Sequence, residues 1–575
     1  METSIPQILH ISFELAHTPV VAEEAGIKAE GACIPHLTAP SSSGPLDREA
    51  EYLAQVRGRV IKALPKERMT ELRRRRNQHL PVYRLPPDVY FYLFELMHHA
   101  NPGSGVGWKV SQVSSMWRKI ALSTPQLWSR IDIINPEFID ACTARSGHIS
   151  LDVAFEPPPP PPPSPPLSLR HTEFLPPPFY YTELPSPAVR ARERLSVASL
   201  LPHAHRWRSL SLIRVDRYVF SPLLSVRAPR LEVLCLEGFT CQSLIAYPAL
   251  KDSPRLRSIQ LESGFVPLAY PTYTGLAELR FHSIKPPIAC DHFLDALRGS
   301  PLLEILDVRD TYISGISSAP MALAPIHLPH LRLIKMDRMK MEVMRYLFTL
   351  IHASPTLNIS GTQYLPESTD LGSLFPSRRV LGGKLPSLLR IQKLVFGLGV
   401  RGEPTLEGYA GSMTLLNLAC EPYEPQVDAA EFSSRIFHNL GRALLLPRLE
   451  ELTIRELTTA TMDRDRFIGA LGKLSSIRHL TLENCDCAYP PTLVVDSSHR
   501  ICPSLESLTI IDTFVDEEIL VSLVESRVAW EGCALQKLAL SRCNPVGQAA
   551  ALKLKSLVVH VTLMDEPVGL LRAAE

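Results

Sequence analysis

One pattern of apolar residues recurs beyond residue 200 of this 575-residue chain and constrains its fold more than any other feature. An apolar residue is followed by two variable positions, a second apolar residue, one variable position and a third apolar residue. The clearest copies are Leu449/Leu452/Ile454, Ile477/Leu480/Leu482, Leu505/Leu508/Ile510 and Leu535/Leu538/Leu540, which begin 28, 28 and 30 residues apart. Such alternation turns one face of a short strand towards a core. One unit cannot bury that face alone, so neighbouring units must stack.

Earlier and looser copies continue the series towards the N-terminus. They are Trp207/Leu210/Leu212, Leu231/Leu234/Leu236, Leu256/Ile259/Leu261, Leu276/Leu279/Phe281, Leu303/Leu306/Val308, Leu331/Ile334/Met336, Ile391/Leu394/Phe396 and Met413/Leu416/Leu418. Their spacing is at the long end of the 20–29 residues typical of leucine-rich repeats. We therefore predict an α/β fold in which residues 201–575 form a divergent leucine-rich-repeat array. This array is a solenoid with a curved parallel sheet and with helices or loops on its outer face.

Two features of the array need separate interpretation. The interval 340–390 lacks a clear copy apart from a weak match at Leu357 and Ile359, and residues 361–380 have the composition of a loop. At the ninth repeat position Asn or Cys usually bonds the backbone of the bending chain. Two copies carry Cys485 and Cys543 there, which explains both as small buried residues of the repeat, and two carry Thr311 and Thr513.

A zinc site built from Cys485, Cys487, Cys502 and His499 is the alternative interpretation of the cysteines. No paired C-x-x-C spacing supports it, and we predict no metal.

The N-terminal part of the chain divides by composition. Residues 1–44 lack any sustained period, which predicts a disordered leader. Residues 45–79 show the three- to four-residue spacing of an amphipathic helix. The basic run Arg73–Arg76 at its end fits a solvated helix end, or alternatively a nuclear-import or phosphate-binding patch. Residues 133–200 are predicted to be a strand and a proline-rich linker, because Pro157–Pro163 favour polyproline II. The tract is a spacer or, alternatively, a ligand for an aromatic-lined groove.

Residues 80–132 contain a compact helical motif that begins LPPDVYFYLFELMHH. Pro86 and Pro87 suit the first turn of a helix, and Asp88 suits its positive end. After the loop NPGSGVG, a second helix is expected to present Val110, Val113, Trp117 and Ile120 at i, i+3, i+7 and i+10. A fragment of about 45 residues cannot bury both apolar stripes internally, so its helices need a partner.

In the order of its apolar residues, this motif resembles an F-box, and the whole chain resembles the F-box and leucine-rich-repeat proteins of mushroom-forming fungi. The resemblance implies a three-helix module that docks a Skp-type adaptor and, through it, a cullin. The docking residues that it implies are Leu85, Pro86, Val89, Leu93, Phe94, Met97, Val110, Val113, Trp117, Ile120, Leu127 and Trp128. The alternative is that these side chains only pack against neighbouring helices, and individual residues are expected to divide between the two roles.

The sequence departs from the resembled family at three places. Ser114-Ser115-Met116 stands where basic residues are usual, Asp88 replaces the common Glu, and the loop from His98 to Gly107 is longer than in the compact form.

The predicted function is that of a substrate-recognition adaptor of an SCF-type ubiquitin ligase, in which the array binds a protein target. The alternative is a repeat scaffold that binds a partner without ubiquitination. In the resembled ligases a separate recruited enzyme transfers ubiquitin, so we predict a non-catalytic subunit without cofactors. Gly397, Gly399 and Gly402 match a dinucleotide fingerprint formally, but Glu403-Pro404 follows where a helix is needed. No G-x-S-x-G, P-loop or H-E-x-x-H motif appears.

Composition indicates the environment and the class of partner. A formal net charge of +1 provides no global field for nucleic acid or an anionic membrane. Eleven cysteines without short paired spacings fit a reducing compartment. No basic n-region or apolar run of about 18 residues appears. We therefore expect protein partners, no nucleic acid, no membrane, and a cytoplasmic or nuclear location.

Overall fold

The computed structural model describes seventeen stretches of the chain. They are residues 71, 74–75, 79–100, 105–132, 136–155, 187–215, 217–238, 253–264, 273–285, 287–315, 324–366, 371–399, 402–423, 429–444, 446–495, 500–530 and 533–564. The predicted leader (1–44), most of the predicted helix (45–79) and the proline tract lie outside them. The chain forms two compact units, one of residues 1–132 and 137–151 and the other of residues 133–136 and 152–575.

The first unit is mainly helical. Its elements are the 3-10 turn η1 (Pro81–Arg84), the helices α4 (Pro87–Ala100), α5 (Val106–Ser111) and α6 (Ser115–Leu122), the 3-10 turn η2 (Pro125–Trp128), the strand β1 (Arg130–Asp132) and the helix α7 (Pro136–Arg145). The helix α7 was not predicted, since residues 133–200 were assigned to a strand and a linker.

The second unit contains one long, mostly parallel sheet. Its strands are β2 (Leu151–Phe155), β3 (Trp207–Ile213), β4 (Val233–Glu237), β5 (Ser258–Glu262), β6 (Glu278–His282), β8 (Ile305–Arg309), β11 (Leu333–Asp337), β13 (Asn358–Leu365), β14 (Lys393–Leu398), β15 (Pro404–Ala410), β16 (Met413–Pro422), β17 (Glu451–Arg455), β18 (His479–Glu483), β19 (Ser507–Ile511), β20 (Lys537–Ser541) and β21 (His560–Met564). Two short parallel pairs flank it, β7 (Ile288–Ala289) with β9 (Ile313–Ser314) and β10 (Ile326–Leu328) with β12 (Ile351–Ala353).

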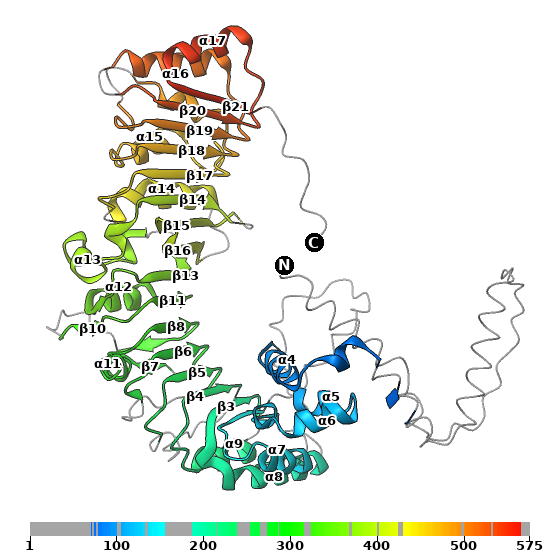
Figure 1. The fold of residues 1–575 in the computed structure, drawn as a ribbon. Helices are drawn as coiled ribbons and strands as arrows, with labels where there is room; N and C mark the ends of the chain where they lie inside the picture. The colour runs from blue at the N-terminus through cyan, green and yellow to red at the C-terminus, as the bar shows by residue number, and fades with distance from the viewer. Residues whose placement is uncertain are drawn as a thin grey trace, which may run out of the picture. The chain divides into compact units, whose positions relative to one another are not determined.

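Helices and 3-10 turns connect successive strands. They are α8 (Pro187–Leu200), η3 (Leu201–Arg206), α9 (Arg217–Ser225), α11 (Cys290–Arg298), α12 (Met341–Leu350), η5 (Leu371–Ser373), α13 (Arg378–Lys384), η6 (Leu388–Arg390), α14 (Ala429–Ala443), α15 (Arg464–Leu471), η7 (Pro490–Leu493), α16 (Glu517–Val528) and α17 (Gln548–Leu557). In Figure 1 the helices α11, α12, α13 and α14 lie along one side of the stacked strands.

The core lies between the sheet and these helices. Phe281 of β6 packs against Phe293 of α11, with ring centroids 6.3 Å apart. Phe396 of β14 packs in the same way against Phe437 of α14, at 4.7 Å. The opposite face of the sheet, called the open face below, carries the alternate residues of each strand.

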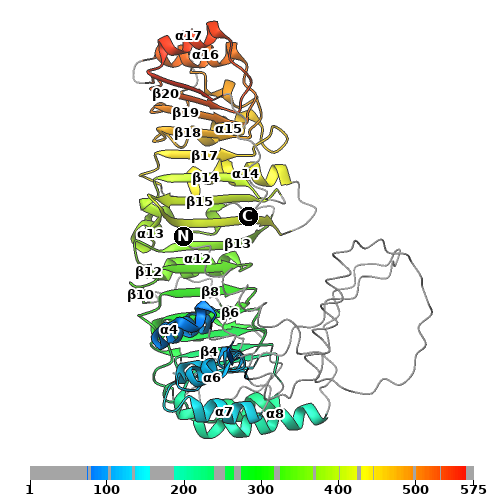
Figure 2. The same cartoon turned by 45° about the vertical axis from the view of Figure 1, so that its right-hand side comes forward.

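The strand registers confirm the predicted repeats. Leu452, Leu480, Leu508 and Leu538 stand side by side on β17 to β20, and so do Ile454, Leu482, Ile510 and Leu540. The looser copies align equally well from Leu210 on β3 through Ile334 on β11. Figure 1 and Figure 2 both show β17 to β20 as neighbouring ribbons in chain order. The three-residue apolar motif therefore identified its strands and their register correctly.

A residue with a left-handed backbone conformation (positive φ) follows most of these strands. Its amide adds one more hydrogen bond to the parallel ladder. Asp310 (φ 46°), Arg338 (φ 56°) and Asn484 (φ 52°) are examples. The amide of Asp310 donates to the carbonyl of Asp337 at 3.0 Å, and that of Arg338 donates to Thr362 at 2.7 Å. The chain then turns inwards to the ninth repeat position.

The ninth-position residues bond the backbone, as predicted. The Thr311 hydroxyl donates to the Arg309 carbonyl at 2.8 Å and accepts from the amide of Ile284 at 3.4 Å. The thiols of Cys485 and Cys543 donate at 3.4 Å to the carbonyls of the residues two positions before them.

The middle of the array differs from the prediction at two places. The segment 361–380 was predicted to be a loop, but residues 361–365 belong to β13 and residues 378–380 to α13. The copy Met413/Leu416/Leu418 comes after Ile391/Leu394/Phe396 in the sequence, but its strand β16 lies before β14 in the sheet, next to β13. β14, β15 and β16 form an antiparallel meander, and β16 rather than β14 pairs with β13 in parallel. Hairpin turns at Gly402 and Gly411, both with positive φ, reverse the chain.

Candidate protein-interaction surfaces

Helix α4 begins where the sequence predicts. Pro87 is its first residue and Asp88 lies in its first turn, where a carboxylate complements the positive helix end. Tyr90 and Phe94, one turn apart, are its buried residues. The Tyr90 hydroxyl donates to the carbonyl of Val82 in η1, and burial raises the pKa of this phenol.

An aromatic cluster holds α4 against α6. The ring of Trp117 lies 5.9 Å from Tyr90 and 5.1 Å from Phe94, in edge-on and tilted geometries that aromatic pairs prefer. Ser114 accepts a hydrogen bond from the amide of Trp117 at 3.2 Å and so caps α6. Trp117 is therefore part of the internal packing of this unit.

The predicted second helix is in fact two helices. Val110 lies in α5, but Val113 lies between the helices, and Trp117 and Ile120 belong to α6. The Ser114 cap starts a new helix where the apolar spacing alone suggested a continuous one. The prediction of one helix from Val110 to Ile120 was therefore wrong.

Close packing of α5 against η2 requires a glycine. A Cβ at Gly107 would lie 2.8 Å from the carbonyl oxygen of Leu127. Trp128 follows in η2, where its indole N–H donates to the Ala121 carbonyl at 2.8 Å and the Arg145 guanidinium lies 4.3 Å above its ring. These contacts fix η2 on the helices.

The twelve predicted docking residues divide by exposure. Phe94, Val110, Ile120, Leu127 and Trp128 are buried. Leu85, Leu93, Met97, Val113 and Trp117 are half-buried, and Pro86 and Val89 are exposed. The five buried residues form the core of the helical unit, so only the other seven can contact a docking partner.

A second apolar stripe on α4 was missed by sequence reasoning. Val89, Tyr92 and Leu96 are 37%, 62% and 43% exposed and recur at i, i+3 and i+7 on one helix face. Helix α4 is thus apolar on two sides, of which one is buried and one faces solvent. The signal was present in YFYLFELM, where apolar residues are too frequent for a single stripe.

On the open face of the array, a network of charged side chains surrounds Asp307. Asp307 of β8 is 2% exposed and accepts two hydrogen bonds from Arg309, at 2.8 and 2.6 Å. The Nε2 atom of His282 on β6 lies 3.4 Å from it, an ion-pair distance. Burial raises the pKa of Asp307, but the bonds and charges of His282 and Arg309 outweigh burial and hold the pKa well below the usual carboxyl range.

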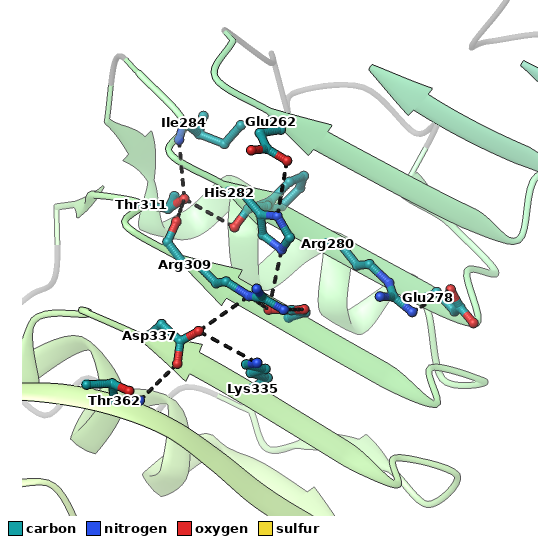
Figure 3. Close-up of polar contacts among 12 residues, drawn as sticks. Glu262, Glu278, Arg280, His282, Ile284, Arg309, Thr311, Lys335, Asp337 and Thr362 are labelled. Atoms are coloured by element: carbon teal, nitrogen blue, oxygen red, sulfur yellow. Dashed lines mark hydrogen bonds and ion pairs between the residues drawn. The ribbon is translucent and has the colours of Figure 1, made fainter. Parts of the chain in front are cut away.

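The network extends over the neighbouring strands. His282 Nδ1 lies 3.5 Å from Glu262 on β5, and Arg309 Nε lies 3.4 Å from Asp337 on β11. Asp337 also accepts from the amide of Thr362 on β13 at 2.9 Å (Figure 3). Side-chain contacts thus connect β5, β6, β8 and β11, and the Thr362 amide extends the network to β13, which stiffens this part of the open face.

Other predicted sites have simpler explanations. Burial raises the pKa of Cys485 and Cys502 to about 11, so both are neutral thiols in the repeat. Among the described residues, no group of three His, Cys, Asp or Glu side chains is placed to hold a metal ion. His499 lies outside those residues.

The glycine fingerprint and the basic run also have local explanations. Gly399 and Gly402 form the turn from β14 to β15, where the Gly402 amide donates to the Gly399 carbonyl at 2.8 Å. No helix N-terminus follows, so the dinucleotide interpretation is excluded. Of the basic run, Arg74 and Arg75 are described, and both form exposed ion pairs with Glu71.

Comparisons with known proteins place few constraints on the chain. No family model matches it, and no curated protein matches it. Among solved structures, an internalin from Listeria monocytogenes is similar at 14% identity and a TM-score of 0.26, covering 64% of this chain and 89% of the internalin. Within the described residues, no helix is both long and apolar enough to cross a membrane.

Proposed function

We propose that this chain is a substrate-recognition adaptor of an SCF-type ubiquitin ligase. In this proposal the unit of α4 to α6 docks a Skp-type adaptor, which leads to a cullin, and the repeat array binds a protein target. The observation that supports it most directly is the second apolar stripe of α4. An amphipathic helix in a self-sufficient unit buries one apolar face and leaves the other polar, whereas α4 leaves Val89, Tyr92 and Leu96 in solvent.

The half-buried residues extend this docking surface. Leu93 lies next to Tyr92 on α4, and Leu85 precedes the helix. Tyrosine and leucine side chains on one helix face can enter an apolar groove of a partner helix bundle, and desolvating such anchors supplies most of the affinity of an interface. The proposed role of the chain is non-catalytic, since holding a target near a charged ubiquitin carrier replaces a bimolecular encounter by an intramolecular one.

The test is a titration of the full chain with the Skp-type adaptor, comparing wild type with Tyr92→Ser/Leu96→Ser. Because two exposed anchors are removed, the Kd is expected to rise about 10- to 100-fold while thermal unfolding is unchanged. The matched control is Leu552→Ser on α17, where the leucine is 63% exposed. The proposal fails if the folded wild type does not bind, or if the double variant binds as tightly as the wild type.

Failure of adaptor binding would leave the second candidate, a repeat scaffold without a role in ubiquitination. The open face favours this candidate, since parallel strands such as β4 to β6 and β17 to β19 present it without the help of an adaptor. The two candidates share target binding by the array and differ only in the use of α4.

A further inference from the structure

The exposed aromatic side chains of the array gather at one edge of the sheet. Among its described residues three are highly exposed, namely Tyr312 (44%), Tyr423 (68%) and Phe514 (65%). Tyr312 lies three residues after β8, Tyr423 directly after β16, and Phe514 three residues after β19. The carboxyl ends of parallel strands share one edge of a sheet. We call this edge the carboxyl rim.

Tyr312, and Tyr364 on β13, each have a cation beside the ring, and both cations follow β11. Lys340 follows β11, and its ammonium lies 4.1 Å from the centre of the Tyr312 ring and 2.5 Å from the Tyr312 hydroxyl. The guanidinium of Arg338 lies 5.6 Å from the centre of the Tyr364 ring on β13. Both distances are within the range of cation–π attraction.

Tyr423 extends the cluster by one strand. Its amide donates to the carbonyl of Leu365 at 3.0 Å, which continues the parallel pairing of β13 with β16 beyond Pro422. Tyr364 and Glu421 are register partners, and Tyr423 follows Glu421 at the next position of the same face. β13 and β16 reach beyond the ends of β8 and β11, and so Tyr364 and Tyr423 lie past the carboxyl ends of β8 and β11.

The charges of the cluster are unequally paired. Arg338 has Asp310 at 3.5 Å, and Asp310 first, with Glu421 as a smaller cause, raises the pKa of Arg338, so two carboxylates accompany this cation. Among the described residues no carboxylate forms an ion pair with Lys340, and its ammonium donates to the Tyr312 hydroxyl. Lys340 is therefore a cation with its charge available beside an exposed ring.

We propose that Tyr312, Lys340, Arg338, Tyr364 and Tyr423 form the docking site for an extended acidic segment of the target protein. A carboxylate of the segment binds Lys340, and an apolar or aromatic side chain packs on the exposed face of Tyr423. Tyrosine and arginine are enriched among the residues that carry most of the binding energy of interfaces, and tyrosine buries a large area with few rotatable bonds. This inference rests on the proposed function, in which the array receives a protein target.

The size of the site fixes the length of the segment. Neighbouring paired strands are about 4.8 Å apart, and β13 leaves β11 after Ser360. The three steps from β8 to β16 therefore cover at least about 14 Å, which takes about five or more residues of extended chain. A segment of that length, lying across the strands, reaches Lys340 and Tyr423 together.

The probe for the test is a fluorescein-labelled random copolymer of glutamate and tyrosine, titrated with the full chain. Tyr312→Ser/Tyr423→Ser and Lys340→Glu are each expected to raise its Kd at least about tenfold. Tyr312→Phe keeps the ring and should stay within about twofold. Phe514→Ser is the matched control, because Phe514 is equally exposed on the same rim but lies beside the Asp512–Arg542 ion pair.

Several results would overturn the inference. They are absence of binding by the folded wild type, equal binding by polyglutamate, binding unaffected by both rim variants, and an equal loss in Phe514→Ser. Thermal unfolding of every variant excludes misfolding as the cause of a loss. Adaptor titration separates this inference from the proposed function, since Tyr92→Ser/Leu96→Ser should keep probe binding and the rim variants should keep adaptor binding.

Discussion

Gly361 occupies a conformation and a space that no other residue can share. Its φ is +144°, and an added Cβ would lie 1.8 Å from the carbonyl oxygen of Met336 on β11. β11 pairs with β13 only from Asn358 to Ser360, immediately before this glycine. Gly361 thus marks the point where β13 leaves β11 and continues along β16 towards Tyr364.

Replacing this glycine should be costly. Gly361→Ala is expected to lower the free energy of unfolding by about 2–4 kcal/mol, since the methyl group forces the backbone apart and the positive φ is strained. Urea unfolding measures the change. Gly383→Ala in α13 is the control, because a Cβ there meets nothing within 4 Å, and it should stabilise by up to about 1 kcal/mol. Equal effects of the two substitutions would contradict this account of Gly361.

Asp307 is the second residue whose chemistry predicts a measurable effect. Its folded-state pKa is depressed, so its ionisation contributes stability above the unfolded-state value of about 4, and this contribution is lost as pH falls through the lower folded-state pKa. Asp307→Asn should cost about 2 kcal/mol at pH 7 because Arg309 loses its bidentate partner. The difference between wild type and variant in urea unfolding should shrink as pH falls below 4. A difference that stays constant down to pH 2 would refute the role of this carboxylate.

At the scale of elements, the parallel pair β10–β12 carries a titratable contact. His327 and His352 are register partners whose rings stack at 4.9 Å, and Lys384 of α13 donates to Nε2 of His352. Burial, then the charge of Lys384, then that of His327 lower the pKa of His352. His352 must therefore be neutral to keep this contact.

The lowered pKa of His352 determines how the stability of the fold should depend on pH. A depressed histidine pKa means that the stabilising contribution is present above the unfolded-state pKa of about 6.5 and is lost as pH falls through the lower folded-state value. Wild type should lose more stability between pH 7 and pH 5 than His352→Gln, measured as urea midpoints. Parallel curves for the two proteins would show that the stacked pair does not titrate in this range.

The local spacing of apolar residues predicted the positions of the strands in the sequence better than it predicted the order of the strands in the sheet. The spacing of Leu452 and Ile454 is enough to define β17, because period-two burial requires it. The antiparallel insertion of β15 and β16 could not be predicted, since Leu416 and Leu418 show the same local spacing as any other repeat. Only pairing over long sequence distances decides that β16 stands beside β13.

The helical unit shows the same limit. Apolar spacing located α4 and α6, but it could not say which stripe is covered by the unit itself. Trp117, a predicted docking residue, is half-buried and packs on Tyr90 and Phe94, whereas the exposed Tyr92 and Leu96 were overlooked. Burial depends on how helices meet in space, which spacing along one helix does not encode.

At the scale of the whole molecule, the array is a stack in which each strand pairs only with its neighbours. Its stability should therefore behave as a sum of repeat and interface contributions, and a local defect should remain local. Leu508 on β19 is fully buried between Leu480 and Leu538. A cavity created by shortening Leu508 therefore weakens the packing beneath β18, β19 and β20.

Leu508→Ala should lower the free energy of unfolding by about 3–5 kcal/mol, from lost transfer energy and the remaining cavity. Hydrogen exchange monitored by mass spectrometry should show lost protection in β18 to β20, a smaller loss in β17, and none in β3 to β6. The helices α4 to α6 form a separate compact unit and should keep their exchange rates. Uniform loss of protection across the array would mean that it unfolds as one cooperative block, and the stack would then not be a nearest-neighbour system.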